Sequence, residues 1–60
     1  MRPHVSIRAD ALPYLKRAAE LAREDQRPVV VGLWRDGTAD YVRVQDINQL
    51  RGAWRVEVRP

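Results

Sequence analysis

The 60-residue chain contains no cysteine, only one histidine and only three glycines. Without cysteine, neither a disulfide nor a thiolate zinc site can stabilise the fold, and one histidine provides no recognisable zinc cluster. The three glycines are isolated from one another, so the chain has no glycine-rich loop that could cradle a phosphate. We therefore expect no metal site, no cofactor and no enzymatic activity.

The chain also lacks a long apolar run. No segment approaches the length of a membrane span, and the N-terminus lacks the apolar region of a signal peptide, so we expect a cytoplasmic protein. Hydrophobic residues make up 45% and charged residues 32%, which is typical of a globular chain. We expect one small domain spanning residues 1–60. Its core should be marginal, because so short a chain buries only about 60% of the surface that its unfolded form would expose. Association with a second copy or with another protein would bury more.

Lysine is nearly absent from the basic residues. Eleven basic residues against eight acidic ones give a net charge of +3, and ten of the eleven are arginines. The planar guanidinium suits contacts with carboxylates, with phosphates and with aromatic rings, so it is common in both protein and nucleic-acid interfaces. GC-rich coding would also enrich arginine over lysine, without any selection for nucleic-acid binding. The basic charge therefore does not indicate which of these partners the chain binds.

The N-terminal half predicts a strand followed by a helix. Residues 4–8 alternate between apolar and polar side chains, which favours a first strand. Asp10 is a candidate helix cap, Pro13 is tolerated in the first turn, and the helix is expected to run to about Gln26. Pro28 prevents its continuation. The helix carries an apolar stripe formed by Ala11, Leu12, Leu15, Ala18, Ala19 and Ala22, with Tyr14 and Leu21 at its border.

Residues 28–45 predict a β-hairpin. Two runs rich in β-branched residues flank Asp36-Gly37, a pair that favours a two-residue type I′ turn. Such a turn places Val31 opposite Val42. The predicted core face of the hairpin consists of Val29, Val31, Leu33, Val42 and Val44. Asp40 falls on this face as well, and we expect it to escape burial at the sheet edge by reaching water or Arg35.

The C-terminal residues predict one helical turn and a last strand. Asp46 is a candidate cap, Gln49 stands three residues later as in a capping box, and Gly52 provides the stop. Ile47 and Leu50 should face inward. The last strand, residues 53–59, should bury Trp54, Val56 and Val58.

The order of elements predicts a two-layer α+β domain of the type β-α-β-β-β. One helix would pack on a mixed or antiparallel four-stranded sheet whose middle strands form the hairpin at Asp36-Gly37. The last strand could pair with either the third or the first strand, so the strand order stays open. The predicted buried set is Val5, Ile7, Leu12, Leu15, Ala19, Ala22, Val29, Val31, Leu33, Val42, Val44, Trp54, Val56 and Val58.

One helix covers one sheet face, and the helix-free face is the candidate for function. The expected partner-binding residues on it are Val30, Trp34, Tyr41, Arg43 and Arg55. Interfaces are enriched in tryptophan, tyrosine and arginine, so we expect homodimerisation or docking to a protein partner, for example as an inhibitor or accessory subunit. The alternative is single-stranded nucleic-acid binding by base stacking and phosphate contacts, although no RNP1 pattern or GXXG clamp is present. The residues of that alternative are Arg8, Trp34, Tyr41, Arg43, Arg55 and Arg59.

Overall fold

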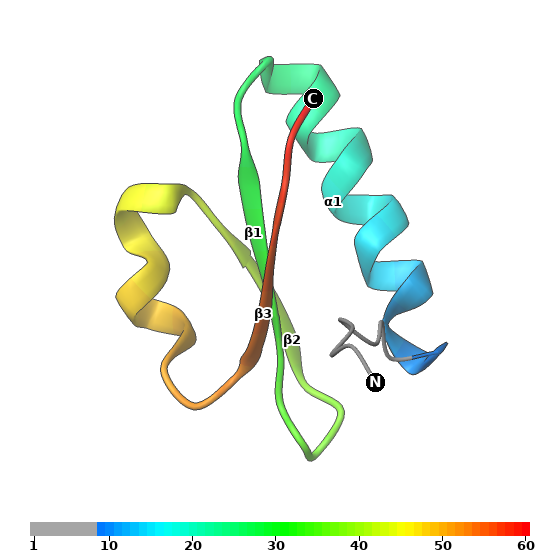
Figure 1. Cartoon of the computed structure of the whole chain (residues 1–60), viewed down its shortest axis with the longest axis vertical. Coiled ribbons are helices and arrows are strands. Elements are labelled where there is room, and N and C mark those ends of the chain that lie inside the picture. Colours follow the sequence, from blue (N-terminus) through cyan, green and yellow to red (C-terminus); the bar gives the residue numbers. More distant parts are fainter. Residues whose placement is uncertain (1–8) are drawn as a thin grey trace, which may run out of the picture.

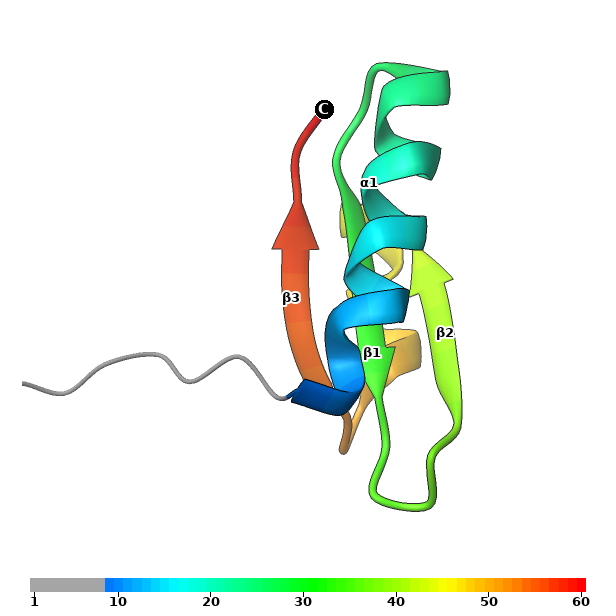
Figure 2. The same cartoon turned by 90° about the vertical axis from the view of Figure 1, so that its right-hand side faces the viewer.

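A three-stranded antiparallel sheet forms the centre of the molecule, and helical segments cover both of its faces (Figures 1 and 2). The computed structural model describes residues 9–60, so the predicted strand at residues 4–8 lies outside the described residues. The α+β class is confirmed, but the four-stranded sheet is wrong, because the described chain forms three strands in the order β2-β1-β3. The elements are η1 (Ala9–Ala11), α1 (Leu12–Asp25), β1 (Val29–Leu33), β2 (Ala39–Val42), η2 (Val44–Leu50) and β3 (Trp54–Val58).

Helix α1 begins without a capping side chain, whereas at its end the side-chain amide of the C-cap residue Gln26 donates to the Arg23 carbonyl over 2.7 Å. Asp10 belongs to the preceding 3-10 turn, and Ala11 takes the N-cap position without a side-chain hydrogen bond, so the predicted Asp10 cap is wrong. A proline lies in the first turn, as predicted. At the other end Gln26 adopts the left-handed conformation at φ 56°, and the Arg27 amide donates to the Ala22 carbonyl over 3.2 Å. Both features close the helix before Pro28.

The alanines of α1 allow close packing on the sheet. Ala18 and Ala22 are fully buried against Val29 and Val31 of β1. Tyr14 and Leu21 pack at the edge of this cluster, as expected for border positions. Leu12, predicted to lie in the core, is 54% exposed instead. It lies on the opposite flank of the helix from Leu21, where no described strand extends beyond β3 to cover it.

The hairpin loop contains three residues, so the predicted two-residue turn is wrong. The Trp34 amide donates to the Thr38 carbonyl over 2.9 Å, and the Gly37 amide donates to the Trp34 carbonyl over 3.0 Å. Gly37 has a φ of 91°, as in a type I turn followed by a left-handed glycine. The Asp36 carboxylate accepts hydrogen bonds from the Thr38 hydroxyl and amide, and these two bonds hold its pKa below the ordinary value.

The extra loop residue shifts the register by one position and thereby exchanges the faces of β2. Val30 pairs with Val42, whereas the prediction paired Val42 with Val31. Consequently Tyr41 lies on the α1 face, and Val42 lies on the opposite face. The same shift removes the conflict at Asp40, which is exposed at the β2 edge, where its carboxylate accepts a hydrogen bond from the Tyr41 amide. Among the ion pairs of residues 9–60, none joins Asp40 to Arg35.

The last strand pairs with the central strand β1, which neither predicted alternative anticipated. Val31 of β1 lies opposite Val56 of antiparallel β3, so β2 and β3 run parallel on either side of β1. The connection between them must therefore cross β1. It does so on the face opposite α1 and lays Leu50, which is fully buried, over Gly32. A Cβ atom on Gly32 would lie 2.8 Å from Leu50 Cδ2, so the absence of a side chain permits this approach.

Segment η2 differs from the predicted capped turn. Its N-cap is Arg43 rather than Asp46, and Asp46 instead marks a kink inside the segment. Leu50 faces inward as predicted, whereas Ile47 is exposed, so that part of the prediction is wrong. Gly52 follows η2 with a φ of 83°, which is consistent with the predicted stop.

Two valines near η2 differ from the prediction in their burial. Val30, expected on an open face, is 1% exposed because η2 covers that side of β1. Val44, expected in the core, is 44% exposed because the chain has already left β2.

The close approach at Gly32 predicts a specific loss of stability. Gly32→Ala places a methyl group against Leu50 and Ala53, so we expect the free energy of unfolding to fall by about 1–3 kcal/mol, as for overpacked cores. Urea unfolding measures this. In the Leu50→Ala background the same substitution should cost less, because the opposing methyl groups are gone. An equal cost in both backgrounds would contradict the assigned contact.

Candidate protein-binding surface

The five predicted partner-binding residues do not share one surface. Val30 is buried beneath η2, and Tyr41 packs against the core on the α1 face. Trp34 is half-buried on the η2 side, where its Nε1 donates to the Arg51 carbonyl over 3.2 Å. Arg55 is exposed and lies opposite Gly32, hence on the η2 side of the sheet.

The remaining basic residues of the predicted sites are also separated. Arg43 forms an ion pair with Asp25 at the end of α1. The Arg59 side chain is largely exposed and contacts Glu57 through a bond of 3.4 Å. Arg8 lies outside the described residues. The expected helix-free face is therefore wrong as a single open platform, because η2 covers its centre.

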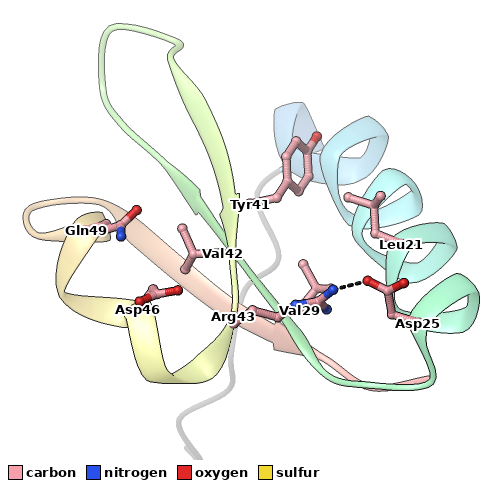
Figure 3. A pocket seen from close by; sticks show the side chains of 8 residues that line it. All are labelled: Leu21, Asp25, Val29, Tyr41, Val42, Arg43, Asp46 and Gln49. Atoms are coloured by element: carbon pink, nitrogen blue, oxygen red, sulfur yellow. Dashed lines mark hydrogen bonds and ion pairs between the residues drawn. The ribbon is translucent and has the colours of Figure 1, made fainter.

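A groove opens at the outer edge of β2, and we refer to it as the β2 groove. It encloses about 340 Å³ between the end of α1, the strand β2 and the segment η2 (Figure 3). Tyr41 is directed to the α1 side of this space and Val42 to the η2 side. The groove is lined by Leu21, Asp25, Val29, Tyr41, Val42, Arg43, Asp46 and Gln49.

Half of the residues that line the β2 groove are apolar or aromatic, and the other half are charged or polar. Arg43 reaches from the end of β2 to the carboxylate of Asp25, and this ion pair spans the α1 side of the opening (Figure 3). On the η2 side, the Asp46 carboxylate makes no hydrogen bond or ion pair with any residue from 9 to 60. The Asp46 backbone amide donates to the Arg43 carbonyl over 2.9 Å. The groove thus presents one carboxylate that a partner could bind.

The surroundings of Tyr41 shift the pKa of its hydroxyl. Burial raises the pKa of its hydroxyl above the ordinary value, and the neighbouring Tyr14 raises it further because two phenolates would repel each other. Arg17 opposes the shift by stabilising the phenolate.

The outer side of η2 carries two exposed apolar side chains, which we call the η2 surface. Val44 is 44% exposed and Ile47 is 37% exposed. The two residues lie three positions apart in η2, on either side of the kink at Asp46. Asp46 and Gln49 of the same segment line the β2 groove. The η2 surface and the β2 groove therefore form adjoining parts of one side of the molecule.

Among residues 9–60, no three histidine, cysteine, aspartate or glutamate side chains gather where they could hold a metal ion. None of the described helices has the length and hydrophobicity to cross a bilayer. Comparison with protein-family models, with curated proteins and with solved structures finds no match, so the surface is interpreted from its own geometry.

Sequence reasoning missed the residues that build this surface. Val44 and Ile47 were expected inside, and Leu21 and Asp25 were not considered together with β2. An aspartate can accept a hydrogen bond from the backbone two residues on, and the bond from the Thr38 amide to Asp36 accompanies the three-residue loop. That loop length alone would have moved Tyr41 to the α1 face. No local sequence pattern indicates that η2 crosses the central strand.

The burial of Tyr41 predicts a pH dependence. A phenol whose pKa is raised by folding contributes stability that is present below its unfolded pKa of about 10 and is lost as the pH rises through the folded value. The free energy of unfolding should therefore decrease at alkaline pH, and it should decrease less in Tyr41→Phe. Urea unfolding between about pH 8 and 11 measures both, and equal slopes in the two proteins would contradict the assignment.

Proposed function

We propose that the chain is a small protein-interaction module without catalytic activity, and that it binds a partner protein through the η2 surface and the β2 groove. The observation that carries the proposal is the exposure of Val44 and Ile47 on a segment whose Asp46 and Gln49 line the β2 groove. Covering these side chains would add buried area to a chain too short to form a large core. An inhibitor or accessory subunit in the cytoplasm is the role that we expect.

The distribution of polar groups supports this proposal. Protein interfaces combine apolar and polar side chains, and here Arg43, Asp46 and Gln49 line the groove together with apolar side chains. The carboxylate of Asp46 favours a partner that brings a basic group beside an apolar side chain. The groove offers carboxylates, a guanidinium and an amide, which position a partner, whereas covalent catalysis would require a nucleophile beside its base.

Nucleic-acid binding has less support. Stacking of successive bases requires aromatic rings on a common surface, but Trp34 lies on the η2 side and Tyr41 on the α1 side of the sheet. Arg43 is engaged with Asp25. We therefore favour a protein partner, and single-strand binding stays a prediction of the sequence.

A matched pair of variants on η2 tests the proposal. Ile47→Lys replaces an exposed apolar side chain by a charge, whereas Gln45→Lys introduces the same charge at an exposed polar position of the same segment. We expect a protein from the source cells that is captured by the native chain and by Gln45→Lys but not by Ile47→Lys. With that protein purified, calorimetry should give a Kd raised by about tenfold or more for Ile47→Lys, because an apolar contact is lost.

The folding of each variant is verified by circular dichroism before capture. If no captured protein distinguishes the two variants, or if the purified pair does not bind, the proposal is wrong. Binding to single-stranded oligonucleotides that weakens steeply with salt would instead favour the alternative.

A further inference from the structure

Strand β3 has an open outer edge in the described chain. It pairs with β1 on one side only, because the strand order is β2-β1-β3 (Figure 2). The edge of β3 is five residues long and continuous, whereas β2 has four residues. An unpaired edge presents amide and carbonyl groups to which another strand can bind.

The hydrogen-bonding pattern determines which groups of β3 point outward. The Trp34 amide bonds the Thr38 carbonyl, and bonded pairs in an antiparallel ladder recur at every second residue, so the even-numbered residues of β1 bond β2. The odd-numbered residues of β1 then bond the even-numbered residues of β3 that lie opposite them. The amide and carbonyl groups of Arg55 and Glu57 are therefore directed to the open edge.

We propose that a second copy of this chain binds along this edge, with β3 antiparallel to β3 and a two-fold axis at Val56. In this register Arg55 of each copy lies opposite Glu57 of the other, in pairs that exchange backbone hydrogen bonds. The result is a continuous six-stranded antiparallel sheet. This interface is separate from the η2 surface and does not depend on the function proposed above.

Charge complementarity selects this register among those that the outward groups allow. A two-fold axis at Arg55 would place the two Arg55 side chains opposite each other, and an axis at Glu57 would do the same for the two Glu57 side chains. Like charges directly opposite each other destabilise a strand pair, whereas opposite charges stabilise it. Glu57 already contacts Arg59 of its own copy, but at 3.4 Å and with both side chains exposed this contact is weak and leaves Glu57 available.

The other face of the same register pairs apolar residues with apolar residues. Val56 meets Val56 of the second copy, and Trp54 meets Val58, all of them half-buried positions on the α1 side. A two-fold axis perpendicular to the sheet also places both α1 helices on this side. The flank of α1 that faces β3 carries Leu12 and Leu15, and the exposure of Leu12 would be reduced by the second helix.

The opposite edge of the sheet is protected in a way that β3 is not. On β2 the odd-numbered residues direct their backbone groups outward, and the Tyr41 amide is already bonded to the Asp40 carboxylate over 2.8 Å. A charged side chain bonded to its own strand edge hinders the approach of another strand. No such side-chain bond to the outward amides of Arg55 or Glu57 is found in residues 9–60.

A charge-reversal cycle tests the register. The native chain should have the mass of a dimer by sedimentation equilibrium. Arg55→Glu and Glu57→Arg should each raise the dimer Kd by about 10- to 100-fold, because both symmetry-related pairs become repulsive. The double variant Arg55→Glu/Glu57→Arg should return the Kd to near the native value. Ile47→Lys, on the other surface, should leave it unchanged.

A cross-link provides a second, independent measurement on the full chain. Since the chain contains no cysteine, Val56→Cys introduces a single thiol, which the two-fold axis places opposite its copy at a non-hydrogen-bonded position suited to a disulfide. It should form a covalent dimer on mild oxidation much faster than the Glu57→Cys control. A native chain that stays monomeric overturns the proposal. So does a dimer that neither responds to charge reversal nor cross-links at Val56.

Discussion

The contact between Leu50 and Gly32 is the constraint on which the rest of this structure depends. It lets η2 cross the central strand at close range, and the crossing brings β3 to the free side of β1. Because the crossing segment lies on the face opposite α1, both faces of a small sheet gain cover, and Val30 becomes part of the core. The chain has no cysteine and therefore no disulfides. The close contact of Leu50 with Gly32 lets a second layer of side chains be buried without them.

The one-residue change in the hairpin loop determines the character of the β2 side. With three loop residues, Tyr41 lies on the same side of the sheet as Leu21 of α1, and Val42 is directed to η2. The strand therefore contributes to both walls of the groove. A two-residue loop would have reversed both side chains, because a strand alternates its faces at every residue. The Arg43–Asp25 ion pair then connects the end of this strand to the end of the helix.

The two surfaces proposed for binding differ in their physical basis. The η2 surface offers apolar side chains next to a groove, and its recognition would depend on shape and on the carboxylate of Asp46. The edge of β3 offers backbone hydrogen bonds, with Arg55 and Glu57 providing the register. The first lies around η2 and the outer edge of β2, and the second lies at the opposite edge of the sheet, so one chain could use both at once.

The sequence by itself determined the elements whose signals are local. The helix with its proline in the first turn, the hairpin strands, the last strand and the inward direction of Leu50 all follow from periodicity and from proline or glycine, and the structure contains them. The residues predicted for the site lie on separate parts of the sheet. Only the tertiary structure decided the exposure of Ile47, the burial of Val30 and the pairing of β3 with β1. These depend on a loop whose length differs by one residue and on a crossing between segments distant in sequence, and neither leaves a periodic pattern in the chain.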